Sequence, residues 1–356
     1  MNITILNNVR AAICWLLLFP FVLNGQSISP NKAISKTYKC GAQNSSKFKI
    51  AADGDFIFYL QDERHSKTHL YRINTSCGFI DSFSFKFPDS NDLIFHALTA
   101  MDVTNDTLVI CYGNHINIYY LTKEGKCRYL KNIIISSEEV IFSASLYQGN
   151  LYLSCDMPNV VQKHIFRTIN CNTGKEFYNV EHLTHLATLT TFKPSNYFAS
   201  LKDTIFYYDV ENFQILTVYN NQIDTLVNVK FFFDSKIDNF IRSTAKIKGL
   251  KELDYYIMNG FGKFKFDFIH EIYISNSKIY LFYFPANHNS TSAKLERQLC
   301  VIEREAGNKT HYVITKTAEY NLLDFQSVIV RDELYIVSNN DNSIYIQEYS
   351  KLVRKN

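Results

Sequence analysis

Residues 97–135 read ALTAMDVTNDTLVICYGNHINIYYLTKEGKCRYLKNIII and contain the pattern that indicates the fold. Polar breaks at 104–106, 113–115 and 123–126 divide this segment into four runs of strand length. The runs are rich in Leu, Val, Ile and Tyr, which suit a pleated, half-buried surface. Four antiparallel strands joined by tight turns form one blade of a β-propeller, so we expect the segment to fold as one blade.

The same pattern recurs along the chain, most clearly at the second strand of each unit. There a polar turn is followed by Ile or Leu and then by an aromatic residue or Val. The aliphatic positions are Ile57, Leu108, Leu151, Ile205, Ile279 and Leu334. Periods of about 40 to 50 residues with four strands each are typical of propellers, where radial stacking buries the faces of sheets that would be exposed alone. We therefore expect an all-β protein, a six-bladed β-propeller of four-stranded antiparallel blades.

Two segments depart from this repeat. Residues 234–266 carry apolar side chains at helical spacing, which predicts an irregular or partly helical excursion between blades. The sixth unit begins at Phe325 and lacks one strand. A propeller whose first and last blades do not join would separate, and the run 33–40 is a spare β-run. We expect this N-terminal strand to complete the last blade; the alternative is a loose N-terminal tail.

The N-terminus has the features of a secretory signal peptide. Arg10 precedes the apolar run 11–23, and the small Gly25 follows it. The run has about 13 residues, whereas a membrane span needs about 20, which disfavours a membrane anchor. We expect residues 1–25 to be a signal peptide, residues 26–356 to form a single propeller domain, and the protein to be secreted or extracytoplasmic. No later segment is long and apolar enough to predict a transmembrane span.

Seven cysteines follow the predicted signal: Cys40, Cys77, Cys111, Cys127, Cys155, Cys171 and Cys300. Secretion permits disulfide bonds, and an odd count leaves at least one thiol free or paired between chains. Cys111 with Cys127, and Cys155 with Cys171, share a spacing of 16. In the predicted blades the partners lie at opposite ends of a strand, beyond the roughly 7 Å that a disulfide can join. The pairing therefore stays open, and no spacing typical of zinc ligands occurs.

Composition and charge narrow the classes of function. The chain is 46% hydrophobic and 15% aromatic, which is typical of a folded protein and not of a disordered one. Its net charge of +3 gives no support to a nucleic-acid partner, which requires a concentrated basic face. A basic run on the excursion could dock an acidic partner or a membrane surface, but a solvated rim is the preferred interpretation. Its residues are Lys246, Lys248, Lys251, Lys263 and Lys265.

Five N-x-S/T sequences follow the predicted signal and are candidate glycosylation sites: Asn44, Asn74, Asn105, Asn289 and Asn308. Asn105 and Asn308 lie in predicted turns, where a sugar is tolerated. Because the chain is rich in Asn, about this many such sequences would also arise by chance.

The candidate catalytic groups have a structural interpretation that we prefer. Asp102, Asp106 and Asp209 with Glu211 could form carboxylate pairs for hydrolysis, but Asp is equally expected at blade turns, where it bonds its own backbone. The histidines are scattered and are best explained as surface or turn residues; His182 and His185 would point to opposite faces of a strand. No nucleophile elbow, phosphate-binding loop or dinucleotide fingerprint occurs. We therefore assign no catalytic, cofactor or metal residue, although calcium stays open.

The blade pattern, the signal ending in Asn24-Gly25-Gln26 and the segment DTIFYYDVENFQILTVYNNQIDTLVNVKF at 203–231 resemble the secreted six-bladed propellers of the TolB-like and NHL-like kind. The resemblance covers nearly all of the chain after the signal. It implies a propeller outside the cytoplasm, in a group whose members mostly bind proteins or glycans and in a minority are enzymes.

We expect a secreted, non-enzymatic propeller that binds a protein or glycan partner through one rim. One alternative is an extracytoplasmic hydrolase or lyase with a calcium or carboxylate site at the central channel. Another is a structural envelope or matrix component that uses its odd cysteine between chains.

Overall fold

Residues 98–134 form one four-stranded antiparallel sheet in the computed structural model, as their pattern predicts. Its strands are β6 (Leu98–Thr104), β7 (Thr107–Tyr112), β8 (His115–Leu121) and β9 (Cys127–Ile134), hydrogen-bonded in that order. Asn105 and Asp106 close the first hairpin with φ of 49° and 61°, the positive values that a two-residue type I′ turn requires. Side chains on both faces of β7 are buried, because this strand lies inside the sheet and between neighbouring sheets.

The structure describes residues 36–39, 48–61, 69–84, 98–156, 163–183, 197–209, 212, 214–229, 268–284, 297–304, 312–314, 319–320, 325–340 and 343–348. Contacts divide the chain into two units, Met1–Lys32 and Ala33–Asn356. The predicted signal peptide and the predicted excursion at 234–266 lie outside the described residues. Within the described ranges, no helix is long and apolar enough to cross a membrane.

Three further sheets repeat the same plan of four antiparallel strands in chain order. Their strands are β2 (Phe48–Asp53), β3 (Phe56–Gln61), β4 (His69–Asn74) and β5 (Ile80–Ser84); β10 (Val140–Tyr147), β11 (Asn150–Asp156), β12 (Lys163–Asn170) and β13 (Glu176–Leu183); and β14 (Phe198–Leu201), β15 (Thr204–Asp209), β16 (Gln214–Tyr219) and β17 (Gln222–Asn228). Their second strands, β3, β11 and β15, contain the aliphatic positions Ile57, Leu151 and Ile205, as the repeat predicts.

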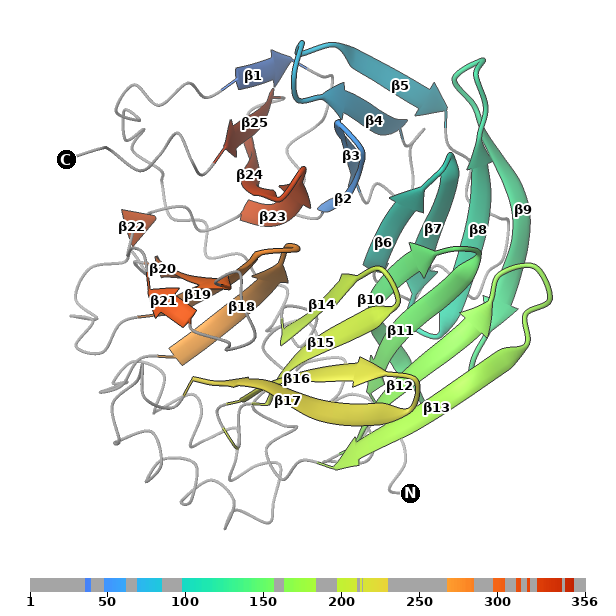
Figure 1. The fold of residues 1–356 in the computed structure, drawn as a ribbon. Helices are drawn as coiled ribbons and strands as arrows, with labels where there is room; N and C mark the ends of the chain where they lie inside the picture. The colour runs from blue at the N-terminus through green and yellow to red at the C-terminus, as the bar shows by residue number, and fades with distance from the viewer. Residues whose placement is uncertain are drawn as a thin grey trace, which may run out of the picture. The chain divides into compact units, whose positions relative to one another are not determined.

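The last sheet joins the two ends of the described chain. It contains β23 (Phe325–Val330), β24 (Glu333–Asn340) and β25 (Ser343–Glu348), and its fourth strand is β1 (Lys36–Lys39). β1 runs antiparallel to β25, with Thr37 opposite Tyr345 (Figure 1). The prediction that an N-terminal strand completes the last blade is confirmed over these four residues.

One sheet differs from the prediction, because it has five strands. Its strands are β18 (Phe268–Ile274), β19 (Lys278–Phe284), β20 (Arg297–Arg304), β21 (Tyr312–Ile314) and β22 (Glu319–Tyr320). β21 pairs with one end of β20 and β22 with its other end, so two short strands share the place of one fourth strand. The described chain therefore has five four-stranded blades, and the prediction of six four-stranded blades is wrong for this sheet.

The first strands of the sheets follow one another and return to the start. β2 contacts β6, and the series continues through β10, β14, β18 and β23, which contacts β2 again. Apolar clusters fill the spaces between neighbouring sheets; one of them joins Tyr59 to Val337 across the first and last sheets. The aliphatic positions of the repeat all lie in this core, with exposed fractions of 0 to 5%: Ile57, Leu108, Leu151, Ile205, Ile279 and Leu334. The all-β propeller of antiparallel blades is thus confirmed.

The cysteines of the described part of the chain are all free: Cys77, Cys111, Cys127, Cys155, Cys171 and Cys300. Cys111 lies near the end of β7 and Cys127 at the start of β9, so the two cysteines lie near opposite ends of β8, as the sequence predicts. Burial raises the pKa of the Cys300 thiol to about 11, which keeps it protonated at neutral pH. The expectation of a disulfide bond is not borne out among these residues, and Cys40 lies outside them.

Candidate functional site

The first strands of the sheets carry few ionisable groups, and the carboxylates among them accept hydrogen bonds from other groups of the fold. In the described ranges, no group of three or more His, Cys, Asp or Glu side chains could hold a metal ion. Asp53 accepts the backbone N–H of Asn105 from the next sheet, at 2.9 Å. Glu271 is 3% exposed and accepts the hydroxyl of Tyr273 at 3.0 Å. These carboxylates stabilise contacts inside the fold.

Asp102 links two neighbouring blades. The backbone N–H of Leu146 in β10 donates to the Asp102 carboxylate at 2.6 Å. The hydroxyl of Thr104 donates to the backbone carbonyl of Leu146 at 3.0 Å. Burial raises the pKa of Asp102 to about 7, against the hydrogen bond from Leu146, which favours the ionised form. Its hydrogen-bond partner is a backbone group, so Asp102 joins strands. The charge of Asp53, in β2 of the neighbouring sheet, also raises the pKa of Asp102.

The other carboxylates considered from the sequence occupy turns, as predicted. Asp106 is exposed at the tip of the β6–β7 hairpin. Asp209 ends β15 and accepts two hydrogen bonds from Asn212, one from its backbone N–H at 3.3 Å and one from its side-chain amide at 2.7 Å. Glu211 lies outside the described residues. Asp106 and Asp209 are on different blades, so they form no pair.

His164 corrects the interpretation of the histidines as surface or turn residues. It lies in β12 with an exposed fraction of 0%. Its ring centroid is 5.7 Å from that of Phe198 and 5.0 Å from that of Tyr207, both in the next sheet. Neighbouring sheets cover both faces of a middle strand such as β12, so even a polar side chain there is buried. His182 is opposite His164 in β13, and His185 lies outside the described residues.

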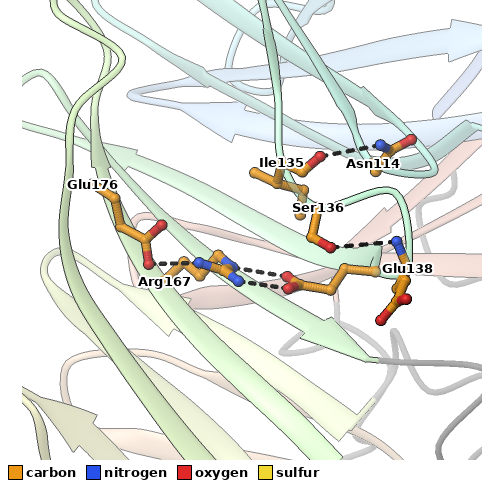
Figure 2. Close-up of polar contacts among 7 residues, drawn as sticks. Asn114, Ile135, Ser136, Glu138, Arg167 and Glu176 are labelled. Carbon is orange, nitrogen blue, oxygen red and sulfur yellow. Dashed lines mark hydrogen bonds and ion pairs between the residues drawn. The ribbon is translucent and has the colours of Figure 1, made fainter.

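A buried ion cluster holds the loop between β9 and β10 against the blade that follows it. Arg167 in β12 donates two hydrogen bonds to Glu139, at 2.7 and 2.5 Å, and one to Glu176 at 2.5 Å (Figure 2). The Arg167 and Glu139 side chains are 11% and 4% exposed. Glu139 raises the pKa of Arg167 above its usual value. The amide of Asn114 donates to the carbonyl of Ile135 at 3.2 Å, which fixes the start of the same loop.

This cluster is self-contained. Both oxygens of Glu139 accept from Arg167, and all three nitrogens of the guanidinium donate hydrogen bonds. A ligand would have to displace one of these bonds to enter. The cluster therefore stabilises the fold and is not a binding site.

A pocket of about 50 Å³ opens between two blades, at the end where the β14–β15 and β16–β17 turns lie. One wall comes from the sheet β10–β13 and the other from the sheet β14–β17. The described residues that line it are Tyr152, Phe166, Thr168, Val180, Asp203, Ile205, Val218, Tyr219, Asn220 and Asn221. The pocket thus combines three aromatic rings, three aliphatic side chains, one carboxylate, two amides and one hydroxyl.

The apolar floor of this pocket is continuous with the core, and its polar groups lie at the mouth. Phe166, Ile205 and Val218 belong to the apolar cluster between the two sheets. Asn220 and Asn221 form the β16–β17 turn with φ of 47° and 64°. Such a two-residue turn has a defined backbone geometry, which positions the side chains next to it.

Tyr152 and Tyr219 frame the mouth together with Asp203. Burial, with a further contribution from the Asp203 carboxylate, raises the pKa of Tyr152, so its phenol stays protonated at neutral pH. Tyr219 keeps 47% of its surface exposed. One oxygen of the Asp203 carboxylate accepts a hydrogen bond from the Thr204 hydroxyl at 3.4 Å. A carboxylate has further acceptor positions, so Asp203 can still bind a ligand together with the exposed aromatic face beside it.

Sequence analysis did not find this pocket. Tyr152 and Tyr219 belong to different repeats, and nothing in either strand distinguishes them from the many other tyrosines. Asp203, Asn220 and Asn221 were recognisable as turn residues, and their side of the fold follows from the hairpin pattern. The pocket depends on how the sheets β10–β13 and β14–β17 pack against each other, which the repeat pattern does not predict.

Two of the five candidate glycosylation sites lie in the described residues. Asn105 is exposed at the tip of a turn, as predicted. Asn74 ends β4, and its side-chain oxygen accepts the N–H groups of Ser76 and Cys77, at 2.9 and 3.0 Å. Asn170 caps the equivalent turn of another blade in the same way, so a structural role accounts for Asn74 as well. Glycosylation stays a prediction; Asn44, Asn289 and Asn308 lie outside the described residues.

No family model matches the chain, and no curated protein matches it in sequence. Solved structures that align with it include a luciferin-regenerating enzyme, with a TM-score of 0.47, 8% identity, and coverage of 88% of this chain and 95% of that one. A protein from Lactobacillus plantarum gives 0.43, 8%, 82% and 80%. A putative 6-phosphogluconolactonase from Bacteroides uniformis gives 0.40, 7%, 86% and 84%.

These values are too low to place the chain in a family or to carry an argument about its activity. The resemblance to TolB-like and NHL-like propellers therefore stays a prediction beyond the level of the propeller fold.

Proposed function

We propose that this protein is an extracytoplasmic, non-enzymatic propeller that binds a protein or glycan partner through one rim. In this proposal the five-stranded sheet β18–β22 serves as the sixth blade, because its first strand continues the series of inner strands between β14 and β23. Location outside the cytoplasm rests on the signal-like N-terminus. Mass spectrometry of protein exported by its own leader would then show a chain that begins near Gln26.

The pocket between the sheets β10–β13 and β14–β17 is the observation that carries the proposal. It lies at the end of two blades where the β14–β15 and β16–β17 turns are, and Tyr152, Tyr219 and Asp203 lie at its mouth. Aromatic residues are enriched where proteins bind partners, because they supply large contact areas at a low cost in conformational entropy. The described carboxylates outside this pocket, apart from the exposed Asp106, that are discussed above accept hydrogen bonds from backbone groups, Asn212, Tyr273 or Arg167.

Arrays of peptides and glycans, probed with the labelled mature protein, test the proposal. The matched pair of variants is Tyr219→Ala, in the pocket mouth, and Tyr120→Ala, at a tyrosine that is 41% exposed in β8 of another blade. We expect binding to one class of spot, a loss of at least about fivefold in Tyr219→Ala and no change in Tyr120→Ala. Equal binding by both variants would place the partner elsewhere and contradict the use of this rim.

A further inference from the structure

The pocket at the rim has a charge and a size that select a kind of ligand. We propose that it receives an alkylammonium group, as presented by a lysine side chain of a protein partner. This inference rests on the proposed function above, and it names the chemistry that the same site would recognise.

The charge of the lining favours a cation. Asp203 is the one charged residue among the described residues of the lining, and the nearest basic neighbour in sequence, Lys202, is not part of it. An anionic ligand would meet an uncompensated carboxylate. A cation would gain an ion pair with Asp203. An ammonium group would also donate hydrogen bonds, and the side-chain amides of Asn220 and Asn221 offer acceptor oxygens for them.

The aromatic rings favour a cation carried on an apolar stem. Ammonium groups are attracted to the faces of tyrosine and phenylalanine within about 6 Å of the ring centroid. Tyr152, Phe166 and Tyr219 all line this pocket. A lysine places four methylene groups behind its charge, and those can cover the aromatic rings of Tyr152 and Tyr219 at the mouth while the ammonium group meets Asp203 there.

The volume disfavours an enclosed sugar ring. About 50 Å³ is well below the roughly 300 Å³ from which pockets that enclose whole small molecules begin. A group at the end of a narrow chain can enter such a space, whereas a pyranose could only lie across the mouth. A protein partner is therefore favoured over a glycan.

Ligand-observed saturation-transfer NMR with small probes tests the inference on the intact protein. The probes are Nα-acetyl-lysine methylamide, its Nζ-acetylated form, the norleucine analogue and a methyl glucoside. We expect transfer to the side-chain protons of the lysine probe, with a signal at least about fivefold weaker for the three uncharged probes. The three uncharged probes separate the contribution of charge from that of apolar contact.

Matched variants locate the site. Asp203→Asn removes the carboxylate in the pocket, and Asp224→Asn removes an exposed carboxylate on β17 of the same sheet. We expect Asp203→Asn to weaken the lysine signal at least about fivefold and Asp224→Asn to leave it unchanged. Thermal unfolding of each variant shows that the fold is retained.

The outcomes separate the two proposals. If the lysine probe binds Asp203→Asn as well as it binds the natural protein, the ammonium inference is wrong. If the glucoside alone binds and Tyr219→Ala abolishes that binding, the ammonium inference fails but the rim remains a binding surface. If no probe binds and the arrays show no dependence on Tyr219, both proposals fail.

Discussion

Asp102 makes the stability of the protein depend on pH. Burial raises its pKa to about 7 in the folded chain, from its usual value of 3.8. Between these values the folded state keeps a proton that the unfolded chain releases. The stabilisation that Asp102 contributes is therefore complete below pH 4 or so and is lost as the pH rises through about 7, at up to about 1.4 kcal/mol per pH unit.

The substitution Asp102→Asn removes this titration and keeps a side-chain oxygen for the N–H of Leu146. We expect the variant to gain stability relative to the natural protein as the pH rises from 4 to 7, and the difference to level off above that. Urea unfolding of both proteins at pH 4, 5, 6, 7 and 8 measures it. A difference that does not vary with pH would show that the carboxyl group is ionised throughout.

Arg167 should be among the most costly polar residues to remove. In Arg167→Met the carboxylate of Glu139 is left buried and unpaired, which typically costs about 3–5 kcal/mol. Glu176→Gln is the control, because Glu176 is 37% exposed and its pair with Arg167 should be worth about 1 kcal/mol or less. Chemical unfolding of both variants, and of Arg167→Met with Glu139→Gln, gives the comparison. The double variant should recover much of the loss; equal losses in the two single variants would contradict a buried pair.

For single residues, the sequence predicted burial correctly where a residue's place in the repeat is enough to determine it. Ile57 and Leu108 lie in second strands, which are covered by strands on both edges and by sheets on both faces, so a local pattern was enough. The partners of Arg167 could not be found in this way. Glu139 lies outside the strands, and its contact with Arg167 depends on how the loop folds back over the blade.

The β6–β7 hairpin shows what a turn contributes to an element. Asp106 has φ of 61°, a conformation that costs residues with a side chain more than it costs glycine. We expect Asp106→Gly to stabilise the protein by about 0.5–1 kcal/mol, since Asn-Gly is the preferred type I′ pair. The backbone carbonyl of Asp106, which accepts the N–H of Leu121, is retained. Thermal unfolding detects the gain.

Asp224→Gly is the matched control for this change. Asp224 is an exposed residue within β17 and is not among the residues with positive φ, so glycine there should destabilise the strand by about 0.5–1 kcal/mol. A gain in both variants would mean that turn geometry is not the cause.

Strand positions were predictable because two-residue periodicity and turn residues are local signals. The five-stranded sheet was not, since the pairing of β21 and β22 with opposite ends of β20 depends on a break in the outer strand. An outer strand is supported by only one neighbour, so its sequence is less constrained than that of a middle strand. The edge of a blade is therefore where a repeat pattern predicts least.

For the whole molecule, the pairing of β1 with β25 is the contact that joins the ends of the propeller. Replacing Thr37 and Tyr38 by proline removes the one N–H of this consecutive pair that faces β25 and disfavours the strand. We expect faster hydrogen exchange in peptides that cover β25, and a lower melting temperature by about 2–4 °C for each kcal/mol lost. Replacing the same two residues by valine preserves the strand and should leave exchange in β25 unchanged. If the proline variant exchanges like the natural protein, β1 does not hold the last blade.

The same pairing has a consequence during synthesis. Thr37 leaves the ribosome about 300 residues before its partner Tyr345. At about 5–20 residues per second, the N-terminal segment waits roughly 15–60 s with an open edge. Every nascent chain therefore passes through a stage in which most of the blades can form while the strand that joins the two ends has nothing to bind, and it is at this stage that another unfinished chain could take the vacant place.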